Sequence, residues 1–96
     1  MKTLRTISKD LNKYMPELKE KYKVKEIGIF GSYARGEQRK TSDIDILIEF
    51  SEPIGWEFVD LKESLESILH TNVDLVTVSA LKPQLKDRIL QEVVYL

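Results

Sequence analysis

The sequence contains no cysteine and only one histidine, His70. The lack of cysteine excludes disulfides, thiolate metal ligands and thiol nucleophiles, and it is consistent with a reducing compartment. A single histidine excludes any site that needs two imidazoles from one chain. No apolar run approaches the roughly 20 residues that a membrane-spanning helix needs, and the first ten residues lack the apolar region of a secretory signal peptide. We therefore expect a cytoplasmic protein without a membrane segment.

The length and composition of the chain predict one folded unit. With 96 residues, we expect a single domain over residues 1–96. Apolar residues make up 42% and charged residues 32%, a globular rather than a disordered composition. The net charge is −1, although eight Lys and Arg against three Asp and Glu fall within residues 1–25. These basic residues lack the Gly-rich spacing of a nucleic-acid-binding module, so direct binding of nucleic acid is not expected.

Apolar residues at helical spacing predict three main helices. One runs from about residue 3 to 21, a second from about 55 to 70, and a third from Pro83 through the C-terminal residues. Pro16 lies inside the first pattern, where a proline either kinks a helix or starts a second short one. His70 falls at the end of the second helix and is interpreted as a helix-terminus residue.

Three further segments predict strands: residues 25–30, 43–50 and 73–78. The second of them alternates strongly, with isoleucines on one face and acidic residues on the other. Residues 31–36, with the sequence GSYARG, form a glycine-bounded turn that can open a short helix. The expected fold class is α+β, a small mixed sheet with helices packed on it, in the order α-β-(short α)-β-α-β-α.

Asp43 and Asp45 are the first chemical signal. Residues i and i+2 of a strand point to the same side, with side chains about 7 Å apart along the chain. Two neighbouring carboxylates raise each other's pKa and destabilise the fold unless a positive charge lies between them. Mg²⁺ binds one or two protein carboxylates and completes its shell with waters and substrate phosphates. The pair therefore indicates a metal site beside a polyphosphate.

The turn at residues 31–36 supplies the phosphate end of this site. Backbone N–H groups at a strand-to-helix turn attract anions, and Gly31 lets the backbone approach a ligand without a Cβ in the way. The Ser32 hydroxyl can donate to a phosphate oxygen, and Arg35 and Gly36 extend the turn. Arg35 either contacts a phosphate bidentately or pins the loop by pairing with a carboxylate. Tyr33 either stacks on a base or packs in the core.

Asp74 supplies a third carboxylate. It lies in a β-branched segment, where a charge is costly. If that strand lies beside the second one, Asp74 faces Asp43 and Asp45, and three carboxylates can hold two Mg²⁺ ions. Asp74 is then both a ligand and the expected proton acceptor. The chemistry this predicts is in-line attack of a hydroxyl on the α-phosphorus of a nucleoside triphosphate, with release of pyrophosphate.

The combined pattern resembles the nucleotidyltransferase superfamily that includes DNA polymerase β, and within it the minimal nucleotidyltransferases (MNT). The resemblance rests on GSYARG at 31–36, SDIDILIEF at 42–50, VDLVTV at 73–78 and the C-terminal LKPQLKDRILQEVVYL. It implies triphosphate binding by Gly31 and Ser32, with Arg35 matching the pattern. It also implies metal binding by Asp43 and Asp45 and a third carboxylate at Asp74.

The resemblance also implies a partner. Minimal nucleotidyltransferases are paired with a helical HEPN-domain protein, often an RNase toxin, for which they act as antitoxins. Some transfer AMP from ATP to a tyrosine hydroxyl of that toxin. The chain has no residues left for an acceptor-binding domain, so we expect the acceptor surface to come from a partner in a hetero-oligomer, or from a second copy in a homo-oligomer.

Two other functions remain open from the sequence. One is an antitoxin that neutralises its partner by occlusion, with catalysis dispensable. The other is nucleotide transfer to a small molecule such as an aminoglycoside. No base-reading residue is identifiable. Trp56 and Phe58 are either core residues or an exposed aromatic edge for a partner.

Overall fold

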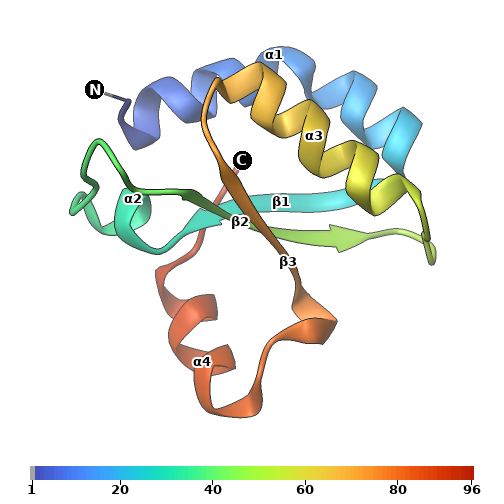
Figure 1. Ribbon diagram of the computed structural model, residues 1–96. Helices are drawn as coiled ribbons and strands as arrows, with labels where there is room; N and C mark the ends of the chain where they lie inside the picture. The colour runs from blue at the N-terminus through green and yellow to red at the C-terminus, as the bar shows by residue number, and fades with distance from the viewer. Residues whose placement is uncertain (1) are drawn as a thin grey trace.

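The structure is a computed structural model that describes residues 2–96. It contains four α-helices, four strands and one short 3₁₀ helix in these residues, arranged as in Figure 1. In chain order the elements are α1 (Leu4–Tyr22), β1 (Val24–Phe30), α2 (Ser32–Arg35), β2 (Ile44–Phe50), α3 (Glu57–Leu69), β3 (Val73–Thr77), η1 (Val78–Ala80), α4 (Pro83–Glu92) and β4 (Val94–Tyr95).

The four strands form one mixed sheet in the order β3-β2-β1-β4. The pairs β1–β2 and β1–β4 are antiparallel, whereas β2–β3 is parallel. Helices α1 and α3 cover one face of the sheet, and α4 lies on the opposite side (Figure 1). The α+β fold class and the mixed sheet predicted from the sequence are confirmed.

The core lies between the sheet and the pair α1 and α3. Helix α1 begins at the N-cap Thr3, whose side chain accepts a hydrogen bond from the N–H of Thr6. Its apolar residues recur every three or four positions and are buried because they face the sheet. The core residues supplied by α1, β2 and α3 include Ile7, Leu11, Met15, Leu18, Ile44, Ile46, Ile48, Leu61, Leu65 and Leu69.

The alternation predicted for β2 is confirmed by burial. Its three isoleucines are fully buried against the helices, while Asp45 and Glu49 are half-buried on the other face. Leu47 shares that second face and is 1% exposed, although it does not belong to the main core cluster. The second face of the sheet is therefore covered locally and carries the acidic residues.

The prediction of a C-terminal helix reaching the last residue is wrong. Helix α4 ends at Glu92, and Val94–Tyr95 form β4, which pairs with β1. Apolar periodicity does not reveal that the edge of β1 offers unpaired backbone groups, and β-branched Val93 and Val94 favour the extended conformation that satisfies them. The expected element order therefore lacks one strand at its end.

Helix α1 runs through Pro16 as one element, so a second helix does not start there. Pro16 is exposed, and buried residues lie on both sides of it, so packing on the sheet holds one helix across the missing backbone hydrogen bond. His70 is the C-cap of α3 and has φ 53°. Its predicted place at a helix terminus is confirmed. No helix within residues 2–96 combines the length and apolarity needed to cross a bilayer.

Candidate active site

Two of the predicted carboxylates face each other across neighbouring strands. In the parallel β2–β3 pair, Asp45 is the register partner of Asp74. Asp43 immediately precedes β2 and, like Asp74, is exposed, whereas Asp45 is half-buried. Strand β3 therefore lies beside β2, which is the arrangement that brings Asp74 to Asp45. All three acidic residues lie at the beginnings of these strands.

The electrostatics of Asp45 reflect this crowding. The pKa of Asp45 is raised from 3.8 to about 6, mainly by burial and then by the negative charges of Asp74 and Asp43, while Arg35 opposes the shift. Among residues 2–96, no group of three or more His, Cys, Asp or Glu side chains is arranged to hold a metal ion. The carboxylates are thus close enough to repel one another, but as placed they do not converge on one point.

Gly31 brings the predicted phosphate-binding turn against this acidic group. It has φ +74°, a conformation that side chains rarely adopt. A Cβ built on Gly31 would overlap Oδ2 of Asp45 and lie 2.9 Å from its Cγ. Glycine is therefore required here for two separate reasons, its backbone conformation and the close approach of Asp45.

The rest of the turn is closed by backbone hydrogen bonds. The N–H of Arg35 donates to the carbonyl of Gly31 at 3.1 Å, and the N–H of Glu37 donates to the carbonyl of Ser32 at 2.8 Å. Gly36 ends the short helix in the left-handed conformation with φ 72°. Tyr33 is 5% exposed within the core cluster, so it packs in the core and does not stack on a base.

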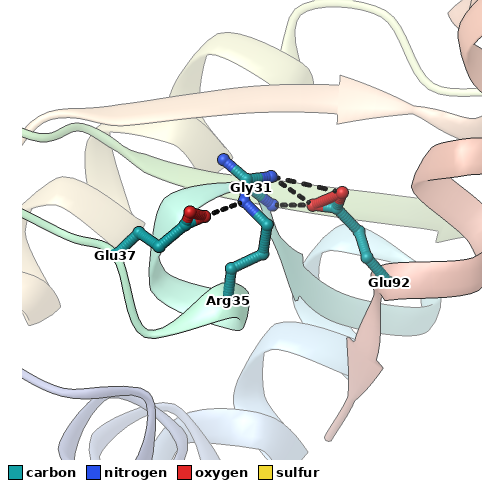
Figure 2. Close-up of polar contacts among 4 residues, drawn as sticks. All are labelled: Gly31, Arg35, Glu37 and Glu92. Carbon is teal, nitrogen blue, oxygen red and sulfur yellow. Dashed lines mark hydrogen bonds and ion pairs between the residues drawn. The ribbon is translucent and has the colours of Figure 1, made fainter.

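Glu92 is a site residue that the sequence did not reveal. The N–H of Gly31 donates to Oε2 of Glu92 at 2.7 Å, and Nη1 of Arg35 donates to the same oxygen at 2.9 Å. Nε of Arg35 donates to Oε1 of Glu37 at 2.7 Å (Figure 2). Of the two roles open for Arg35, the structure shows pairing with carboxylates.

The position of Glu92 follows from β4. The antiparallel register pairs Gly28 with Tyr95 and Ile29 with Val94. Two residues further along the same register, Glu92 lies beside Gly31, and its side chain accepts the hydrogen bond from the Gly31 N–H. Only the pairing of β4 with β1 contains this information, whereas apolar spacing predicts a helix through those residues.

A groove of about 710 Å³ lies at the other ends of β2 and β3. Its lining includes Phe50, Phe58, Thr77 and Lys86. The ring of Phe58 packs edge-on against Phe50 with centroids 6.5 Å apart, whereas Trp56 is 88% exposed. The hollow and the carboxylates are therefore separate features, and we assign the candidate chemistry to the carboxylates because the charged groups and the glycine turn meet there.

Comparisons with known proteins identify a matching family and similar sequences and structures. The family described as nucleotidyltransferase domain matches residues 11–96. The protein adenylyltransferase MntA of Thermococcus cleftensis is 47% identical over 96 residues, covering 99% of this chain and 97% of its own. A solved structure assigned as a minimal nucleotidyltransferase superposes with a TM-score of 0.84 at 32% identity, covering 99% of this chain and 97% of the other. A toxin–antitoxin complex with AMP-PNP gives a TM-score of 0.72 at 29% identity, covering 88% of this chain and 69% of the other.

Proposed function

Because the chain belongs to the nucleotidyltransferase domain family, we propose that it transfers AMP from ATP to a hydroxyl of a HEPN-domain toxin and so acts as the antitoxin of that toxin. The observation that carries the proposal is the contact of the Gly31 turn with Asp45, which is itself the register partner of Asp74. A phosphate-binding turn and a carboxylate group at one place are what nucleotidyl transfer needs.

The acidic residues fit divalent cations by their chemistry. Asp43, Asp45 and Asp74 offer only carboxylate oxygens, the donors that Mg²⁺ prefers. The raised pKa of Asp45 reflects burial and negative charge that a bound cation offsets. These three residues would hold up to two Mg²⁺ ions, and such ions would neutralise charge on the triphosphate and lower the pKa of the attacking hydroxyl.

The turn binds and orients the nucleotide. In this proposal the backbone around Gly31 and Gly36 approaches the phosphates, and the Ser32 hydroxyl donates to a phosphate oxygen. Arg35 adds positive charge at the same end of the site. With the triphosphate fixed between this turn and the carboxylates, the α-phosphorus lies beside Asp74, at the open edge of the site.

Asp74 is the proton acceptor of the proposed reaction because it is exposed and can meet a hydroxyl that arrives from outside. The acceptor oxygen, a tyrosine hydroxyl of the toxin in our proposal, forms a bond to the α-phosphorus. The bond between the α-phosphorus and the bridging oxygen breaks, and pyrophosphate leaves. Three findings support a protein acceptor: the relative named protein adenylyltransferase, the similar toxin–antitoxin complex, and the exposed Trp56.

The test is a transfer assay with labelled ATP, Mg²⁺ and a HEPN-domain partner. We expect label on the partner with the wild type and none with the double variant Asp43→Ala/Asp45→Ala, while Asp87→Ala, an exposed carboxylate on α4, serves as the matched control. A mass spectrum of the partner then gives the number of AMP units and the acceptor residue.

Three results would contradict the proposal. Label that persists in the double variant would exclude the carboxylates. Toxin neutralisation that survives in the double variant would favour occlusion of the toxin without catalysis. Transfer to a small molecule in the absence of any protein partner would replace the acceptor class.

A further inference from the structure

We infer that Glu92 is a positioning residue for the triphosphate, acting through Arg35 and the Gly31 amide. The inference rests on the proposed function, because it assigns Glu92 a role at the same nucleotide site. It adds a carboxylate from the C-terminal helix to a site that is otherwise built from β1, α2, β2 and β3.

Glu92 makes three hydrogen bonds to the turn. One carboxylate accepts from the Gly31 N–H at 2.7 Å and from Nη1 of Arg35 at 2.9 and 3.2 Å. Charge-assisted hydrogen bonds of this kind are about twice as strong as neutral ones and fix the planar guanidinium in direction. Glu92 therefore fixes the position of two groups of the turn, the Gly31 N–H and the Arg35 guanidinium.

The pairing with carboxylates leaves one nitrogen of Arg35 available. Nε of Arg35 donates to Glu37, and Nη1 donates to Glu92. In the part of the chain that the structure describes, Nη2 donates to no protein group. Figure 2 shows this third nitrogen turned away from both carboxylates. A guanidinium whose four rotatable bonds are already ordered can engage a phosphate oxygen through Nη2 with little further loss of entropy.

The Glu92 carboxylate is shielded from solvent at a cost that its partners must offset. Within Pro83–Glu92, all of which is described, no residue is buried, yet the Glu92 side chain is only 18% exposed. A largely shielded carboxylate needs partners, and its partners here are all in the turn. Glu92 also raises the pKa of Asp45, so it lies within electrostatic reach of the carboxylate group.

An opposite role would be that of an internal anion that occupies the phosphate position and must be displaced. That role predicts tighter nucleotide binding when Glu92 is neutralised. A positioning role predicts weaker binding, so the sign of one measurement separates the two.

The experiment is calorimetric titration of the full chain with AMP-PNP in the presence of Mg²⁺. Glu92→Gln keeps an acceptor for the Gly31 N–H but removes the charge that pairs with Arg35. We expect it to weaken AMP-PNP binding about tenfold, as loss of a charge-assisted bond requires. Asp87→Asn, which removes a charge from an exposed position on the same helix, is the control and leaves the affinity unchanged.

Two further readouts exclude a merely structural effect. AMP lacks the β- and γ-phosphates, so its affinity, measured by NMR titration, stays unchanged in Glu92→Gln. In an Arg35→Gln background, Glu92→Gln has little additional effect, because the two residues act as one unit. Equal loss of AMP and AMP-PNP binding, additive effects in the double variant, or unchanged or tighter AMP-PNP binding would each overturn the role of Glu92. A wild type that does not bind AMP-PNP would instead contradict the proposed function, and the role of Glu92 with it.

Discussion

Asp45 and Asp74 are register partners across the parallel strands β2 and β3, and Asp45 is the half-buried member of the pair. Burial is the main cause that raises the pKa of Asp45 to about 6, and the charge of Asp74 adds to it. The ligand-free fold therefore holds a carboxylate in a place where its charged form is disfavoured. Such strain is typical of functional sites, where it is relieved by a ligand.

Neutralising Asp45 should stabilise the metal-free protein. The folded pKa of about 6 lies above the ordinary value of 3.8. The ionisation of Asp45 therefore leaves the free energy of unfolding unchanged below pH 3.8 and lowers it increasingly between pH 3.8 and 6. Above pH 6 the free energy of unfolding is lowered by the full amount. The full pKa shift corresponds to a loss of about 3 kcal/mol in the free energy of unfolding. Solvent screening of the half-exposed side chain reduces this loss to about 1 kcal/mol.

We therefore expect Asp45→Asn to raise the free energy of unfolding at pH 8 by about 1 kcal/mol in the presence of EDTA. The gain should shrink as the pH approaches 4. Urea unfolding of both proteins at several pH values measures it, with Asp87→Asn as the exposed control. A gain that is the same at every pH would show that the charge of Asp45 is not its cause.

Mg²⁺ should reverse the order of stability of the same two proteins. A ligand that binds the folded state at ten times its dissociation constant stabilises by about 1.4 kcal/mol. We expect Mg²⁺ to raise the melting temperature of the wild type and EDTA to remove the effect, whereas Asp45→Asn responds little. Na⁺ at matched ionic strength is the control for screening. An equal response of both proteins to Mg²⁺ would place the ion elsewhere.

Gly31→Ala should be far more damaging than Gly36→Ala. Both glycines have positive φ, +74° and +72°, so both variants carry backbone strain of about 1–2 kcal/mol. Only at Gly31 does the new Cβ meet Asp45, whereas among residues 2–96 nothing lies within 4 Å of a Cβ on Gly36. We expect an additional loss of about 1–3 kcal/mol for Gly31→Ala, together with loss of AMP-PNP binding. Urea unfolding and calorimetry measure both, and equal losses at the two positions would contradict the close approach.

Gly28→Ala should disturb the site from a distance. A Cβ on Gly28 would lie 2.6 Å from Cγ2 of Val93 and 3.2 Å from the carbonyl oxygen of Val94. Overpacking of this kind costs about 1–3 kcal/mol, and it pushes β4 and the adjoining Glu92 away from β1. We expect lower stability by urea unfolding and weaker AMP-PNP binding.

Gly55→Ala is the matched control for that variant, because in the described part of the chain no atom lies within 4 Å of a Cβ on Gly55. Its free energy of unfolding should change by less than about 0.5 kcal/mol. If Gly28→Ala lowers stability without weakening AMP-PNP binding, β4 does not govern the site.

The sequence was most informative where the chain makes its own local pattern. Alternation in residues 43–50 predicted which face of β2 carries the isoleucines and which carries Asp45, because the side-chain period of a strand is fixed by its backbone. The spacing of the glycine turn and the acidic residues predicted a common location for them. The structure places Gly31 against Asp45, and the roles of these residues remain the proposal tested above.

The C-terminal residues show the limit of such patterns. Apolar spacing predicted a helix through Val93 and Tyr95, but these residues are extended because the edge of β1 pairs with them. Which strand edge needs a partner depends on the order of strands in the sheet, and no window of local sequence contains that order. Glu92 and its contact with Gly31 were missed for the same reason.

The amino-acid sequence by itself determined the strand alternation, the glycine-bounded turn and the presence of three acidic side chains, because each depends on residues a few positions apart. The tertiary structure alone decided that Asp74 lies beside Asp45, and that Glu92 meets the Gly31 amide and Arg35. The physical reason is that backbone hydrogen bonds between distant strands set the register. That register, rather than any local preference, brings the backbone of Gly31 and the side chains of Asp45, Asp74 and Glu92 to one place.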